Sequence, residues 1–115
     1  MPSSDQPGWI TMVPGIRRQT LVSGDTMMQM IVQLDAGSRL PEHSHPHEQV
    51  THVLRGRLCL ILAGIPYELG AGESLYIASN TPHAAEIDED TLVIDTFSPP
   101  RHDLLAQDRE LLGAP

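Results

Sequence analysis

Glycine and proline interrupt this chain at short intervals, and this spacing constrains its fold more than any other feature of the sequence. The chain contains nine glycines and ten prolines. The main breaks lie at Pro14-Gly15, Gly24, Gly37, Gly56, Gly64, Gly70 to Gly72, Pro82 and Pro99-Pro100. The segments between these breaks are too short for most helices but long enough for strands, so the spacing predicts an all-β sandwich or barrel.

Alternation of apolar and polar residues places the individual strands. Met28, Met30, Val32 and Leu34 alternate with glutamines at positions 29 and 33, which gives this segment one buried face. Further strands are predicted at residues 49–54, 57–62, 66–69, 74–77, 83–87 and 91–97. The acidic run between the last two of these segments is typical of a solvated hairpin turn.

The C-terminal tail differs in character from the rest of the chain. Four leucines repeat there with a seven-residue offset: Leu104, Leu105, Leu111 and Leu112. This pattern predicts one short amphipathic helix over about residues 102–112, stopped by Gly113 and packed on the outside of the β domain. With 115 residues in all, the chain has the length of a single domain.

Charge and composition exclude several classes of function. The chain has 15 acidic residues against 7 basic ones and a formal net charge of −8. This balance argues against nucleic acid and anionic membranes as partners, because both require a basic surface. All the basic residues are arginines, so a mechanism that depends on a Schiff-base lysine is excluded.

The sequence favours a cytoplasmic location. Its first residues lack the cationic segment and apolar run of a signal peptide. The longest apolar stretch, near residues 58–65, is far shorter than the ~20 residues that span a bilayer. Cys59 is the only cysteine, so no intrachain disulfide can form, and its apolar neighbours predict a buried, inert thiol.

The chain has six histidines, and three of them, His43, His45 and His47, fall within five residues. If this segment is extended, the side chains at 43, 45, 47 and 49 share one face, and those at 44, 46 and 48 share the other. Three imidazoles and the Gln49 carboxamide would then converge on the inside of the barrel, whereas Glu48 would point away from it.

Neutral imidazole is the commonest protein ligand for zinc, nickel, manganese and iron. We interpret His43 and His45 as ligands of one such divalent ion, and His83, which follows the turn at 80–82, as a further donor. The alternative is a patch of surface histidines in an extended loop. We interpret His47 as a ligand or a rim neighbour of the site. His52 and His102 are interpreted as polar residues without a role.

Two spacings in this region resemble those of a known superfamily. The pattern Gly37-x5-His43-x-His45-x3-Gln49-x6-Gly56 resembles the first motif of the cupins, and Gly72-x10-His83 resembles the core of the second. The resemblance covers about residues 29–97. It implies a single cupin domain over residues 1–115, with a core at about 28–98 folded as a double-stranded β-helix, or jelly-roll barrel. It also implies one divalent metal ion (Zn, Ni, Mn or Fe) inside that barrel.

Gln49 stands where cupins usually carry a glutamate. Three histidines and a neutral amide leave the charge of a bound ion uncompensated. That favours Lewis-acid chemistry, in which the ion polarises an oxygen or lowers the pKa of a water, over the stabilisation of high oxidation states. The substitution therefore weighs against an oxidase or a dioxygenase.

A second group of polar residues lies near the end of the chain. On the strand predicted at 91–97, Asp95 shares a face with apolar residues, where a carboxylate is costly to bury unless it is paired or takes part in catalysis. Arg101 follows the Ser98-Pro99-Pro100 turn, which would hold it at the mouth of the barrel for binding a substrate carboxylate. The alternative is that Asp95 and Arg101 only neutralise each other.

The segment Asp95-x-Phe97-Ser-Pro-x-Arg101-x-Asp103, taken with the histidine cluster and an early tryptophan, resembles the pectin-degradation (KdgF-type) cupins. Those proteins convert ring-form unsaturated monouronates from pectin or alginate into open, ketonised forms. The resemblance implies that Asp95, Phe97 and Arg101 are catalytic or contact the substrate. It implies the metal ligands His43, His45, Gln49 and His83.

The leading hypothesis is therefore a metal-dependent cupin enzyme, of isomerase or lyase type, acting on a small anionic sugar acid. Two alternatives stay open: an isomerase, lyase or dioxygenase acting on another small molecule, and a metal-stabilised module that binds a ligand without turnover. Small barrels with exposed edge strands often pair those edges, so we expect a homodimer.

Overall fold

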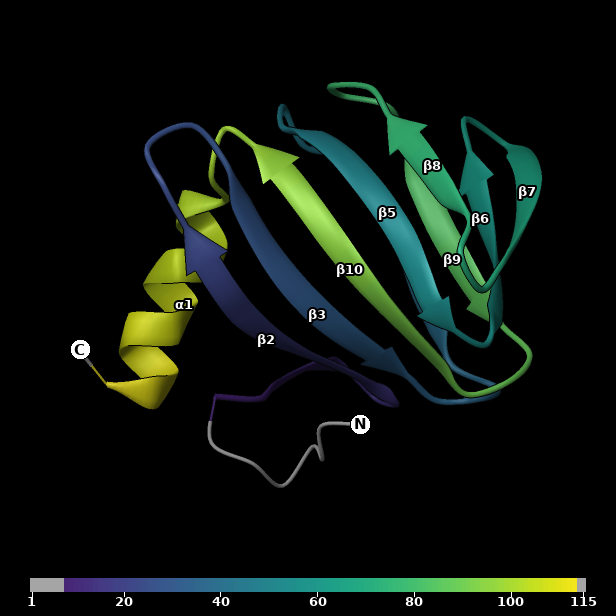
Figure 1. Cartoon of the computed structure of the whole chain (residues 1–115), viewed down its shortest axis with the longest axis horizontal. Coiled ribbons are helices and arrows are strands. Elements are labelled where there is room, and N and C mark those ends of the chain that lie inside the picture. The colour runs from purple at the N-terminus through teal and green to yellow at the C-terminus, as the bar shows by residue number, and fades with distance from the viewer. Residues whose placement is uncertain (1–7, 114–115) are drawn as a thin grey trace.

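The computed structural model describes residues 8–113, which form ten strands and one helix (Figure 1). The elements are β1 (Ile10–Val13), β2 (Ile16–Ser23), β3 (Met28–Leu34), β4 (Arg39–His43), β5 (Glu48–Arg55), β6 (Arg57–Leu62), β7 (Ile65–Gly70), β8 (Ser74–Ile77), β9 (His83–Ile87), β10 (Thr91–Ser98) and α1 (His102–Leu112). Every strand predicted from the sequence is present, and the helix has the predicted bounds.

The strands form two antiparallel sheets, visible on either side of Figure 1. The larger sheet has the order β1-β2-β3-β10-β5-β8, and the smaller has the order β4-β9-β6-β7. In the larger sheet the last strand, β10, lies between β3 and β5, so segments far apart in the sequence are paired. The all-β prediction is confirmed, and two sheets of this kind with a short C-terminal helix are those of a jelly-roll barrel.

The core lies between the two sheets and is built from the alternating residues of their strands. Val32 on β3, Val93 on β10 and Leu60 on β6 belong to one buried cluster, in which Phe97 is the one aromatic residue. Burying an aliphatic side chain of this size stabilises the fold by about 1.5–3 kcal/mol. The core of the described residues is therefore mostly aliphatic.

The N-terminal strands β1 and β2 were not predicted, and they extend the larger sheet beyond the expected core.

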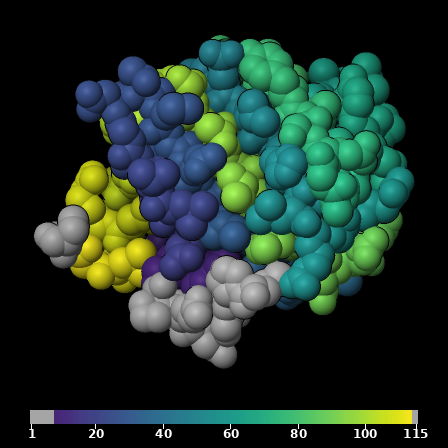
Figure 2. All heavy atoms as spheres, in the orientation of Figure 1, coloured from purple at the N-terminus to yellow at the C-terminus, as the bar shows by residue number. Residues whose placement is uncertain are grey.

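A buried arginine on β2 joins this extension of the sheet to the helix. Arg18 is 0% exposed and donates to Asp108 Oδ1 (2.9 Å), to Gln107 Oε1 (3.1 Å) and to the Leu104 carbonyl (3.3 Å). Figure 2 shows α1, in yellow, against the blue N-terminal strands. The helix is thus anchored to the sheet through a charged contact as well as through its leucines.

Gly56 forms the tight connection between β5 and β6, and it is one of the glycines of the first cupin-like motif. Its φ of 91° is in the left-handed region, where other residues are strained. A Cβ atom built there would lie 2.3 Å from the Asp90 carbonyl oxygen. This position therefore requires glycine, because the β5–β6 turn packs directly against the loop that precedes β10.

The expectation of a buried Cys59 thiol is not met. Cys59 is half-buried rather than fully buried, although burial still raises the pKa of its thiol. Among residues 8–113 no helix has both the length and the apolar character needed to cross a membrane.

Candidate metal centre

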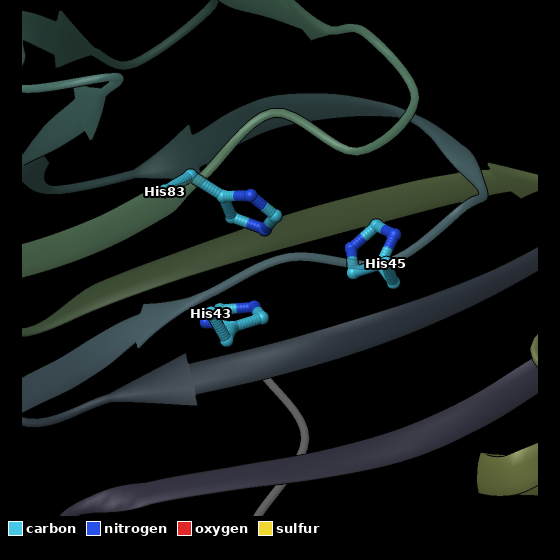
Figure 3. A group of neighbouring side chains, drawn as sticks. All are labelled: His43, His45 and His83. Atoms are coloured by element: carbon cyan, nitrogen blue, oxygen red, sulfur yellow. The ribbon is translucent and has the colours of Figure 1, made fainter.

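Three histidines from different parts of the fold meet inside one end of the barrel (Figure 3). His43 ends β4, His83 begins β9, and these two residues are paired across the smaller sheet. His45 lies in the connection between β4 and β5. One ring nitrogen from each histidine lies within 4.8 Å of the others, a grouping that could hold a metal ion.

The predicted alternation along residues 43–49 persists although residues 44–47 are not in a strand. His45 and Gln49 are buried, and His43 and His47 are half-buried. The residues between them are exposed, including Glu48. The inward face therefore carries the imidazoles and the carboxamide, as the pattern of the sequence indicates.

Hydrogen bonds to the backbone determine which ring nitrogen each histidine presents. The Nδ1 atom of each histidine lies within hydrogen-bond distance of a backbone carbonyl oxygen. The distance is 2.9 Å for His43, 3.1 Å for His45 and 2.8 Å for His83. Because a carbonyl only accepts hydrogen bonds, each Nδ1 carries a proton, and in the neutral form of each ring Nε2 carries the lone pair. The Nε2 atom of His83 is buried without a hydrogen-bond partner among the residues that the structure describes.

Gln49 supplies a second observation that fits a cation. Its Oε1 lies 3.1 Å from His45 Nε2. Burial, assisted by Arg101 and His83, lowers the pKa of His45 to about 4, so this ring is neutral at pH 7. With the proton on Nδ1, the contact brings two lone pairs together, which is unfavourable unless a cation lies between them.

The donor set thus fits a divalent metal. Three imidazole nitrogens and one amide oxygen suit zinc, nickel, manganese and iron, so the residue types do not select one of these ions. Burial also lowers the pKa of His83, which favours the neutral form of the ring that metals bind.

A chain of hydrogen bonds connects the histidine cluster to Asp95 on β10. Gln49 Nε2 donates to Thr51 Oγ1 (3.0 Å), and Thr51 Oγ1 donates to Asp95 Oδ1 (2.7 Å). Asp95 is 8% exposed, and desolvation raises the pKa of its carboxyl to about 6 despite these hydrogen bonds. The carboxyl can therefore exchange a proton near neutral pH.

Arg101 makes its ion pair with Asp103 rather than with Asp95. Its Nε and Nη2 atoms donate to the two carboxylate oxygens of Asp103, at 3.1 Å and 2.9 Å. The guanidinium carbon also lies 5.1 Å from the centre of the Phe97 ring, within the range of a cation–π contact. This arrangement holds the guanidinium in place and leaves its remaining N–H groups for another anion.

A cavity of about 300 Å³ connects these groups. Its polar wall includes His43, His83, Gln49, Asp95 and Arg101. The rest of the wall is largely aliphatic, with Met30, Val32, Leu58, Leu60 and Val93 among its residues. The structure therefore gathers the sequence-predicted site residues around one space, with His45 at the metal cluster and Phe97 also on the cavity wall.

Comparison with known protein families shows to which family the chain belongs. Residues 30–97, more than half of the chain, match the Cupin domain family. The chain belongs to the cupins. The match extends from β3 to β10, so it covers both strands that flank the metal cluster and the strand that carries Asp95.

Three known proteins are similar to this cupin over most of its length. It is 29% identical over 103 residues to the pectin degradation protein KdgF of Dickeya dadantii, an alignment that covers 88% of this chain and 94% of that protein. It is also similar to the structure of KdgF from a Halomonas species, with a TM-score of 0.78 and 33% identity over 84% of this chain and 89% of that one. An RmlC-like cupin from Shewanella frigidimarina gives a TM-score of 0.81 at 29% identity, covering 90% and 93% of the two chains.

The other histidines of this cupin lie outside the cluster of donors. The ring of His47 is 5.3 Å from that of His45, and it is the His47 backbone carbonyl that contacts His45 Nδ1. His52 contacts the Ser74 hydroxyl at 2.7 Å on the other face of β5, and His102 is exposed at the start of α1.

Sequence reasoning assigned no role to Thr51 or Asp103, which contact Asp95 and Arg101 in the structure. A signal for Thr51 was available, because it shares the inward face of its strand with Gln49. Asp103 offered a weaker signal, since its contact depends on the bend between β10 and α1.

Proposed function

We propose that this cupin is a metal-dependent enzyme that opens and ketonises unsaturated monouronates released from pectin or alginate. The observation that carries the proposal is the shared cavity, which places a histidine cluster, a carboxyl with a raised pKa and an anchored arginine around one small space. The similarity to the KdgF proteins over most of the chain supports the same reaction class.

In the proposed site His43, His45 and His83 would hold the metal through Nε2, and Gln49 would do so through Oε1. A divalent ion there supplies Lewis acidity, which polarises an oxygen of the sugar. Because Gln49 is neutral, no ligand offsets the positive charge of the ion. The four residues themselves exclude water from one side of the cavity and orient the sugar oxygens toward Asp95.

Asp95 is proposed to move the proton. Ring opening removes the proton from the hemiacetal hydroxyl, breaks the ring carbon–oxygen bond and leaves an enolate. Returning that proton to the enolate carbon completes the ketone, so the overall change is an isomerisation and needs no second reactant. A carboxyl with a pKa of about 6 can both accept and return a proton near neutral pH.

Arg101 and Phe97 are proposed to position the substrate. The end of the guanidinium that Asp103 does not occupy would bind the carboxylate of the uronate with two parallel hydrogen bonds. Phe97 would support this by packing under the guanidinium and along the sugar ring. Holding both ends of the substrate fixes the reacting carbon near Asp95.

The test is an assay of the purified, metal-loaded protein on an unsaturated monouronate. Turnover is followed by the loss of the ultraviolet absorbance of the conjugated acid, with nuclear magnetic resonance to identify the open keto product. Asp95→Asn should lower kcat by at least about 100-fold, the usual scale for a general acid–base group, while substrate binding is kept. Glu86→Gln, which changes a carboxylate on the smaller sheet that pairs with Arg39, is the matched control and should not change kcat.

Absence of turnover in the wild-type protein loaded with each of the four metals would refute the proposed activity. Retained binding of the uronate in that case would favour a module that binds a sugar acid without turnover. Unchanged kcat in Asp95→Asn would instead remove Asp95 from the mechanism and leave the activity in place.

The aliphatic part of the cavity wall favours a second candidate, a metal-dependent isomerase or lyase acting on a less hydroxylated carboxylate. Leu58, Leu60 and Val93 offer no hydrogen bonds to sugar hydroxyls. A parallel assay of small unsaturated and 2-oxo carboxylic acids separates the two candidates, because a higher kcat/KM for these acids would favour the second.

A further inference from the structure

Thr51 occupies the position between the metal cluster and the acid–base group. It lies on β5, two residues after Gln49 and on the same face, and its cross-strand partner on β10 is Asp95. The residue is 3% exposed and lines the cavity. Both of its hydrogen bonds are made with groups of the proposed site.

The direction of these hydrogen bonds follows from the single proton of the hydroxyl. An ionised Asp95 can only accept a hydrogen bond, so Thr51 donates its proton to Asp95 Oδ1 and its oxygen accepts from Gln49. The group of Gln49 that faces Thr51 must then be the amide nitrogen. A flipped amide would present an oxygen to Thr51, and the hydroxyl would need a second proton to satisfy it.

This constraint determines what Gln49 presents to the histidines. With the amide nitrogen held by Thr51, the Oε1 atom points toward His45 Nε2, at 3.1 Å. An amide oxygen is a metal ligand, whereas an amide nitrogen has no available lone pair. We propose that Thr51 is a positioning residue that fixes the Gln49 carboxamide with its oxygen toward the metal and holds Asp95 against the same wall. The part that concerns Asp95 rests on the proposed function, and the part that concerns Gln49 rests on the metal centre alone.

Thr51→Val tests this inference because valine keeps the branched shape and removes the hydroxyl. Thr51→Ser is the conservative variant and restores the hydroxyl. Thr96→Val is the matched control. Thr96 follows Asp95 on β10, but its side chain lies on the opposite face of the sheet, where its hydroxyl contacts Gln29 at 3.3 Å. Circular dichroism checks the fold of each variant, and Thr51→Ala replaces Thr51→Val if the valine variant does not fold.

The readouts are the affinity for Co(II), measured by calorimetry, and the visible absorption spectrum of the cobalt-loaded protein. Loss of an outer contact to a metal ligand typically weakens binding on the order of 10- to 100-fold. We expect that loss and a changed cobalt spectrum in Thr51→Val. Thr51→Ser and Thr96→Val should match the wild type in both readouts.

Equal cobalt affinity and identical spectra in Thr51→Val and Thr96→Val would overturn the inference. These readouts do not involve the substrate, so they separate this inference from the proposed function. Wild-type protein that binds Co(II) but does not convert uronates would refute the activity while the role of Thr51 at Gln49 stands. Wild-type protein that binds no Co(II) would overturn both the metal centre and the role of Thr51.

Discussion

Replacing Asp95 by Asn should stabilise the metal-free protein, although it removes the group proposed to move protons. The carboxyl is buried on β10, where it accepts a hydrogen bond from the Thr51 hydroxyl at 2.7 Å. An asparagine keeps an oxygen that can accept this hydrogen bond and carries no charge. The variant therefore removes the cost of burying an ionised carboxylate and keeps the contact with Thr51.

The magnitude follows from the pKa of Asp95, which desolvation raises from 3.8 to about 6. A raised pKa in the folded state means that the folded chain binds the proton more tightly than the unfolded chain. The cost is therefore absent below about pH 4 and is complete above about pH 6. At 1.36 kcal/mol per pKa unit it amounts to about 3 kcal/mol, and roughly half of it is already present at pH 5.

Urea denaturation of the metal-free proteins from pH 5 to pH 8, in the presence of a chelator, measures this difference. The free energy of unfolding of Asp95→Asn should exceed that of the wild type, and the excess should grow with pH to about 3 kcal/mol. Glu86→Gln again serves as the control, because its carboxylate is partly exposed and its removal should give a small difference.

A difference between Asp95→Asn and the wild type that does not change with pH would refute the reasoning, because the cost would then not come from ionisation. Destabilisation of Asp95→Asn at pH 8 would refute it as well. That result would mean that the folded chain stabilises the ionised carboxylate through contacts beyond its hydrogen bonds and the charge of Arg101.

Three further predictions concern the metal, the substrate and the helix. The double variant His43→Ala/His45→Ala should contain no metal by mass spectrometry and lose little stability; full metal content would mean that the site lies elsewhere. Asp103→Ala should raise KM for a carboxylated substrate roughly tenfold, about 1.4 kcal/mol, with little change in kcat, because Arg101 loses its anchor; an unchanged KM would contradict this. Asp108→Asn should lower the free energy of unfolding by about 3 kcal/mol in urea denaturation, because it leaves the buried guanidinium of Arg18 without a carboxylate to balance its charge; a loss no larger than that of ordinary surface variants would contradict this.

The parts of the fold and site that could be predicted from the sequence depend on local backbone geometry. Successive side chains of extended chain point to opposite sides, so the inward set at 43, 45, 47 and 49 could be read directly. The alternation survives even where the chain bends at residues 46–47, because the exposed Pro46 lies on the outward side. The same reasoning placed Asp95 and Phe97 on one face of β10, and both line the cavity.

The parts that could not be predicted depend on contacts between distant segments. Strand β2 carries two consecutive arginines, which gave no apolar alternation to identify a buried face. Arg18 is nonetheless buried, because its partner Asp108 follows 90 residues later. The contact of Thr51 with Asp95 likewise requires the register between β5 and β10, and a shift of one residue would put the two side chains on opposite faces.

The charges around the proposed site fit an anion although the chain has a net charge of −8. Gln49 is neutral, so no metal ligand would offset the charge of the divalent ion, and Arg101 adds a second cationic group on the cavity wall. Glu42 and Asp95, which also line the cavity, and Asp103, which pairs with Arg101, offset part of this positive charge. Under the proposed function the substrate carboxylate would bind Arg101 through charge-assisted hydrogen bonds, which a neutral sugar cannot make.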